Sequence, residues 1–163
     1  MAVSALFRGL GLVAFLAGPA QAEVNLDNFH QCLEAQIAAN APALACVQAE
    51  QSECSNYQAE KAPAAATLCL VKANDIWSEA IRTTLADIRT KVQDTDQAQI
   101  ADISEIEVKY DVLSGLLQCD RVQELALLGD TSSERINVQK STCTATTMGL
   151  SYAKLRLQSR GLR

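Results

Sequence analysis

The sequence predicts an all-α protein, a disulfide-stapled bundle of about five helices that form antiparallel hairpins. Good helix formers such as Ala, Leu, Gln and Glu dominate the chain after residue 22, and no segment alternates β-branched residues at the spacing of a strand. Pro42 and Pro63, the only prolines in that part, fall where helices should begin. Six cysteines lie among the predicted helices, and an even number favours crosslinks between them.

The first 22 residues have the pattern of a signal peptide. Arg8 precedes an apolar run over residues 9–18, and Ala20-Gln-Ala22 forms a small-x-small cleavage site. The run is shorter than the roughly 20 apolar residues of a membrane-spanning helix, although an uncleaved N-terminal anchor is an alternative. We therefore expect a mature chain from Glu23, without stable membrane insertion, in the periplasm or secreted.

Two breaks separate the first three predicted helices. The first helix should run from Asn25 or Asp27 to Ala39, and the second from Pro42 to about Ala59. The third, from Pro63 to about Val92, contains Trp77, which we expect in the core because a large side chain fills space well. The apolar positions of the third helix include Leu68, Val71, Ile76, Leu85 and Ile88.

The fourth helix is predicted over Gln97 to Leu128, capped by Thr95 or Asp96. It carries a single apolar stripe with steps of three and four residues, the pattern by which an amphipathic helix packs on a core. Gly115 costs about 1 kcal/mol relative to Ala unless another helix packs closely there. The stripe consists of Ile103, Ile106, Tyr110, Leu113 and Leu117.

Gly129 is a natural stop before the last predicted helix. Thr131-Ser-Ser-Glu134 has the form of a capping box, and the helix it opens should run to about Leu157. Residues 158–163 would then be a basic C-terminal tail, and residues 23–157 a single helical domain.

The charge of the chain is negative and unevenly distributed. Without Arg8, 13 basic and 19 acidic residues give a net charge of −6, which excludes a nucleic-acid binder because phosphates would repel it. All 19 acids lie within residues 23–134, whereas residues 135–163 hold six bases and no acid. The basic end complements a helix dipole and aids solubility, or it meets an anionic partner while the acidic body meets a cationic one.

Helical geometry restricts how the cysteines pair. Cys46 and Cys54 would lie about 12 Å apart on one helix, too far for a disulfide. In an antiparallel hairpin the paired residues are equidistant from the turn, and three pairs satisfy this at the three predicted turns. A Cys32–Cys54 pair competes at the first turn. The three pairs are Cys32–Cys46, Cys54–Cys69 and Cys119–Cys143.

The residue patterns give no support for catalysis, a metal or a cofactor. The chain has no CxxC motif and one histidine, His30, so the ligand spacing of zinc sites and the motif of thiol oxidoreductases are both missing. A hydrolase would have to use His30, which has no signature around it. The paired carboxylates of the fourth helix flank its stripe, where solvated charges are ordinary. An exposed Trp or Tyr would instead indicate a binding hot spot; the candidates are Tyr57, Trp77, Tyr110 and Tyr152.

Three segments share their order and spacing with a known family. They are Cys69-Leu-Val-Lys-Ala-Asn-Asp-Ile-Trp77, then Leu117-Gln-Cys119-Asp, and finally Cys143 followed by Thr146-Thr147 and Leu150. This arrangement resembles the LprI-type lysozyme inhibitor domain of bacterial envelope proteins. The resemblance covers most of the chain after the signal peptide in layout. It implies an exported protein-binding domain, not an enzyme, that blocks a cationic lysozyme sterically and electrostatically. A periplasmic structural or assembly protein without an enzyme target is the alternative.

Overall fold

A computed structural model describes residues 24–56 and 61–162, and the described residues form helices and connecting turns without a strand. The predicted signal peptide and Tyr57 lie outside the described residues. The all-α class is confirmed, with one helix more than expected. The helices are α1 (Leu26–Ala38), α2 (Leu44–Glu50), α3 (Ser52–Asn56), α4 (Pro63–Val92), α5 (Gln99–Leu127) and α6 (Ser133–Ser159).

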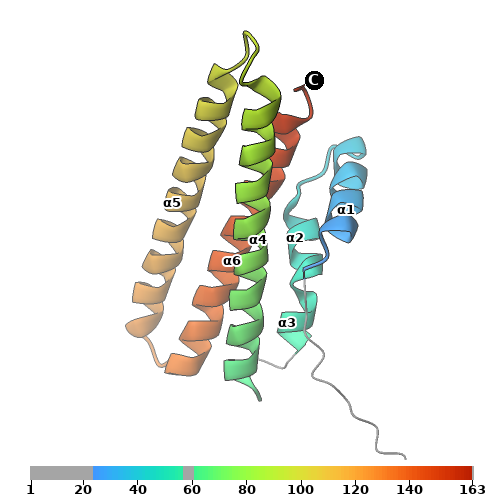
Figure 1. Ribbon diagram of the computed structural model, residues 1–163. Helices are drawn as coiled ribbons and strands as arrows, with labels where there is room; N and C mark the ends of the chain where they lie inside the picture. The colour runs from blue at the N-terminus through green and yellow to red at the C-terminus, as the bar shows by residue number, and fades with distance from the viewer. Residues whose placement is uncertain (1–23, 57–60, 163) are drawn as a thin grey trace, which may run out of the picture.

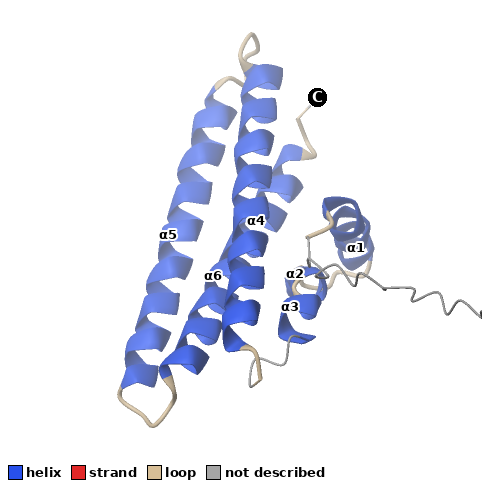
Figure 2. Cartoon of the chain, turned by 60° about the horizontal axis from the view of Figure 1, so that its bottom comes forward, coloured by secondary structure: helices blue, strands red, loops and turns tan. Residues whose placement is uncertain are grey.

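The three long helices form an elongated bundle in which α5 lies at one edge (Figure 1). The chain ascends along α4, descends along α5 and ascends again along α6, and α6 contacts both of the others. The short helices α1, α2 and α3 lie on the opposite side of the α4 and α6 pair, as the turned view also shows (Figure 2). One side of α5 is therefore left without a neighbouring helix.

The core lies where the short helices meet α4 and α6. Phe29 of α1 packs edge-on against Trp77 of α4 with ring centroids 4.8 Å apart, and both side chains are fully buried. The predicted core position of Trp77 is thus confirmed. Val47 of α2 lies so close to Gly149 of α6 that a Cβ there would be 2.6 Å from Val47 Cγ1. The glycine allows α2 to lie directly on α6.

The three predicted disulfides are confirmed, and the competing Cys32–Cys54 pair is not formed. The Cα–Cα distances are 5.7 Å for Cys32–Cys46, 5.4 Å for Cys54–Cys69 and 5.6 Å for Cys119–Cys143. The first bridge ties α1 to α2, the second ties α3 to α4, and the third ties α5 to α6. Crosslinks of this kind fit an exported chain, because they persist in oxidising compartments.

Small residues and a disulfide build the contact between α5 and α6. A Cβ on Gly115 would lie 2.3 Å from Thr147 Cγ2, so the two helices touch closely at this point. The close helix packing that would justify Gly115 is therefore confirmed. Cys119, one turn further along α5, is bonded to Cys143 and also contacts the Thr147 hydroxyl at 3.6 Å.

Several predicted boundaries were wrong, among them the start of the second helix, which begins at Leu44 and not at Pro42. The expected second helix is divided at Gln51, whose buried side chain accepts a hydrogen bond from Thr146 of α6 at 3.1 Å and so ties the segment to the bundle. α5 begins after Ala98 with no side-chain cap, because Thr95 instead bonds within the preceding turn. The cap of α6 is Ser132, not the Thr131 box.

The basic C-terminal end belongs largely to α6 and pairs within the chain. α6 continues to Ser159, two residues into the segment predicted as a tail, because its backbone bonds are maintained there. Its cations lie against acids of other helices, in the ion pairs Lys140–Asp120, Lys154–Asp111 and Arg160–Glu34. The acidic body and the basic end thus neutralise one another in part. This pairing within the chain explains the uneven distribution of charge, and the sequence alone did not suggest it.

Candidate functional site

The outward side of α5 is a continuous apolar surface open to solvent. Its five residues are 48% to 69% exposed, and Tyr110, the most exposed, lies at the centre. Monomeric proteins rarely expose a contiguous apolar patch without a binding role. The exposed tyrosine meets the condition set above for a hot spot. We call this surface the α5 face; it comprises Ile103, Ile106, Tyr110, Leu113 and Leu117.

The inward side of α5 explains why the large residues point outward. The side chains that α5 buries are small, and α6 approaches them closely at Gly115. A larger residue on this side would push the helices apart and strain the Cys119–Cys143 bridge. The buried residues of α5 are Ala101, Ser104, Val108 and Cys119.

The expectation that the stripe of α5 packs on the core was therefore wrong. Helical spacing shows that the five residues share a face, but small residues on the opposite side form the contact with the bundle. Leu68 and Val71 of α4, counted among the apolar positions of that helix, are also exposed, whereas Ile88 is buried as expected.

Ion pairs within the chain neutralise most carboxylates beside the α5 face. Arg89 of α4 bonds Glu105 at 2.8 Å and lies 3.5 Å from Asp102. Lys154 of α6 bonds Asp111 at 2.7 Å, and this hydrogen bond raises the pKa of Lys154. The carboxylates predicted to be merely solvated thus hold α5 against its neighbours, and the α5 face is predominantly apolar.

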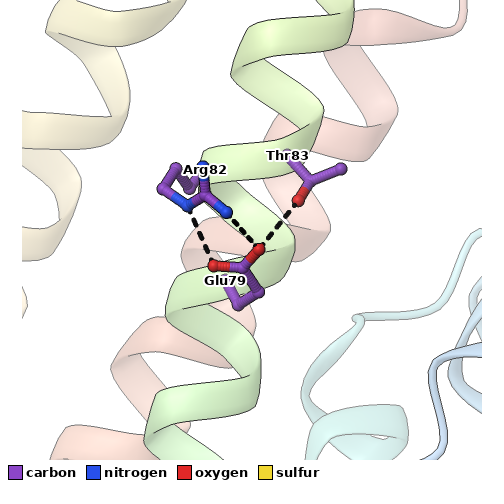
Figure 3. Close-up of polar contacts among 3 residues, drawn as sticks. All are labelled: Glu79, Arg82 and Thr83. Atoms are coloured by element: carbon purple, nitrogen blue, oxygen red, sulfur yellow. Dashed lines mark hydrogen bonds and ion pairs between the residues drawn. The ribbon is translucent and has the colours of Figure 1, made fainter.

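A groove of about 500 Å³ between α1, α4 and α6 is the other candidate. Glu79 of α4 is one of three acids that line it, with Asp75 and Asp87. Arg82 and Thr83 of the same helix already bond Glu79 (Figure 3). The hydrogen bond from Arg82 lowers the pKa of the Glu79 carboxyl, and Glu79 in turn raises the pKa of Arg82. Glu79 is therefore paired within its own helix and by itself adds little attraction for a cationic ligand.

His30 also lines this groove, where its ring contacts a tyrosine of α6. Its Nε2 lies 2.7 Å from the Tyr152 hydroxyl. Burial lowers the pKa of His30, and the charge of Arg156 lowers it further, against the opposing charge of Asp27. Burial raises the pKa of Tyr152, while Arg156 and a hydrogen bond with Thr84 act in the other direction. The contact between His30 and Tyr152 joins α1 to α6.

The described residues contain no group of three side chains suited to hold a metal ion. In the same part of the chain, every cysteine is in a disulfide. No described helix combines the length and apolarity that crossing a membrane requires.

Comparisons with protein-family models, with curated proteins and with solved structures find no match for this chain.

The α5 face is thus the stronger candidate, and its residues were visible in the sequence but assigned to packing. Two signals could have identified it. The stripe uses only two positions per seven residues, whereas the core-facing side of a helix usually uses three or four. Small residues such as Ala101, Ser104 and Gly115 lie on the other side of the same helix, where another helix can approach.

Proposed function

We propose that this chain is an exported, non-catalytic protein-binding domain that binds its partner through the α5 face. The observation that carries this proposal is the exposure of five large apolar side chains along one line of α5. Such a line is the recognition surface for an amphipathic helix or a complementary apolar groove. The Cys119–Cys143 bridge and the Gly115 contact make the surface rigid, which reduces the entropic cost of binding.

The family resemblance and the net negative charge support a cationic lysozyme as the first partner to test. Acidic proteins attract basic ones from a distance, and the attraction weakens as salt screens it. Blockade would then combine long-range attraction by the acidic body with contact at the α5 face, and no bond in either protein would be broken.

One observation favours the alternative, a structural or assembly role without an enzyme target. Most carboxylates that border the α5 face are paired within the chain, for example Glu105 with Arg89 and Asp111 with Lys154. A surface built for a strongly basic enzyme should leave such acids unpaired. Apolar helix-to-helix assembly depends less on salt than lysozyme binding would.

Leu113→Glu tests the proposal, and Leu68→Glu is its matched control. Both residues are exposed leucines on long helices, but Leu68 lies on α4, outside the α5 face. The protein is titrated against a lysozyme acting on cell-wall substrate over a series of salt concentrations, and envelope complexes are isolated in parallel. We expect Leu113→Glu, and not Leu68→Glu, to lose inhibition or complex formation. Equal behaviour of both variants in both assays would refute a binding role for the α5 face.

A further inference from the structure

We propose that the partner of the α5 face is a second copy of this chain, whose α5 lies antiparallel to the first across a two-fold axis. This inference rests on the proposed function, because it names the partner of the same surface, and it takes the assembly alternative in place of lysozyme contact at the α5 face. A two-fold pair needs a self-complementary surface, and both the spacing and the charges of α5 meet that requirement.

The spacing of the α5 face is that of a coiled-coil seam. Its residues follow one another by steps of three, four, three and four. Two apolar positions in every seven is the repeat by which two helices interlock side chains, whereas a core-facing helix uses three or four. The seam from Ile103 to Leu117 is about 21 Å long, at 1.5 Å per residue. Two such seams form apolar layers in which Leu113 of one copy faces Tyr110 of the other, and Leu117 faces Ile106.

The charges beside the seam favour an antiparallel pair over a parallel one. Positions that flank a seam set the orientation of paired helices through attraction and repulsion. A parallel, in-register pair would place Asp102 of one copy beside Glu107 of the other, and like charges disfavour this, since Arg89 is shared with Glu105 and offsets the charge of Asp102 only in part. An antiparallel pair centred between Tyr110 and Leu113 brings Arg121 of one copy alongside Glu107 of the other, once on each side of the axis.

The residues of this contact are available in the single chain. Arg121 is exposed and has no ion-pair partner within residues 24–56 and 61–162. Glu107 accepts a hydrogen bond from Gln158 of α6, which positions its carboxylate beside the seam, and the charge of Lys154 acts on it only from a distance, since Lys154 bonds Asp111 instead. Both lie on the same edge of α5, as the antiparallel arrangement requires.

The interface is one helix wide, so we expect weak association with a dissociation constant of about 1–100 μM. The test is sedimentation equilibrium of the protein expressed from the full gene and purified with its disulfides intact, over a concentration series that spans this range. The wild type should pass from monomer to dimer and no further, because a two-fold contact closes on itself. Leu113→Glu should weaken dimerisation about tenfold or more, and Leu68→Glu should not change it.

A charge exchange tests the orientation. Arg121→Glu alone should weaken dimerisation, because it places two acids together. The double variant Glu107→Arg/Arg121→Glu should restore it, since the exchanged pair is again of opposite charge. Failure of the double variant to recover would overturn the antiparallel arrangement.

The outcomes separate this inference from the proposed function. A protein that stays monomeric throughout the series, while Leu113→Glu still abolishes binding to another protein, overturns the dimer and leaves the proposed function intact. A dimer that persists in Leu113→Glu overturns the proposed contact, because association must then use another surface. Circular dichroism of each variant at low concentration confirms that the monomer is folded.

Discussion

Gly149 is the position where the packing of the short helices can be tested most sharply. A Cβ at this position would lie 2.6 Å from Val47 Cγ1 and 3.2 Å from Trp77 Cε2, and both neighbours are fully buried. Overpacking a core costs about 1–3 kcal/mol. Replacing glycine by alanine inside a helix returns about 1 kcal/mol. We therefore expect Gly149→Ala to lower the free energy of unfolding by about 0–2 kcal/mol, which is the overpacking cost less the gain in helix propensity.

The effect should reverse when Val47 is shortened. Val47→Ala removes two buried methyl groups and should itself cost about 1–3 kcal/mol. It also removes the atoms closest to a new Cβ on residue 149. In that background Gly149→Ala should stabilise the protein by about 1 kcal/mol, because the gain in helix propensity remains and the cavity is partly filled.

Urea unfolding of the four proteins of this double-mutant cycle, followed by circular dichroism, measures the coupling. We expect a coupling energy of about 1–3 kcal/mol between residues 47 and 149. Gly161→Ala is the control, since no atom lies within 4 Å of a Cβ built there, and it should change stability little. A Gly149→Ala substitution with the same effect in both backgrounds would refute the packing of α2 on α6.

Three further predictions concern stability. Replacing Cys119 and Cys143 together by serine should lower the free energy of unfolding, measured by urea unfolding, by about 3–4 kcal/mol, because the bridge closes a loop of this size in the unfolded chain. An unchanged urea midpoint would contradict the presence of this disulfide. Because burial lowers the pKa of His30 below its ordinary value of 6.5, its contribution to stability should be complete above pH 6.5 and should be lost as the pH falls below that value. His30→Gln should remove this slope from the pH dependence of the melting temperature. In the monomer, Leu155→Ala should lower the free energy of unfolding by about 2–5 kcal/mol, because this side chain is fully buried. Leu117→Ala should lower it by less than about 1 kcal/mol, because Leu117 is 67% exposed. Equal losses would show that the α5 face is buried in the monomer.

Much of the scaffold could be predicted because its constraints are local. Pro63 marks the first residue of α4 as expected, since a proline fits only the first turn of a helix. The disulfides followed from the requirement that paired cysteines be equidistant from a turn, as in Cys119–Cys143. The division at Gln51 could not be predicted, because neither proline nor glycine marks it and its cause is a contact with Thr146, far along the chain.

The sequence showed which residues of the candidate site share one side of a helix, but it did not show whether that side faces the bundle or the solvent. Periodicity placed Ile103 to Leu117 on one side of a helix, and this grouping was right. Which side of the helix meets the bundle depends on the partner helix, here the close approach of Thr147 to Gly115. A single sequence contains both faces but does not show which of them α6 occupies.

Hydroxyl-radical footprinting of the wild-type protein, read by mass spectrometry, tests most directly whether the α5 face is a docking surface. In dilute protein Tyr110 and Leu117 should react strongly, while Tyr152 and Leu155, which are buried, should not. In the assembled state, reached by raising the concentration or by adding a bound partner, the reactivity of Tyr110 and Leu117 should fall and that of the rest of the surface should not. An α5 face that is protected already in the dilute monomer, or that reacts equally in every state, would contradict the proposed role.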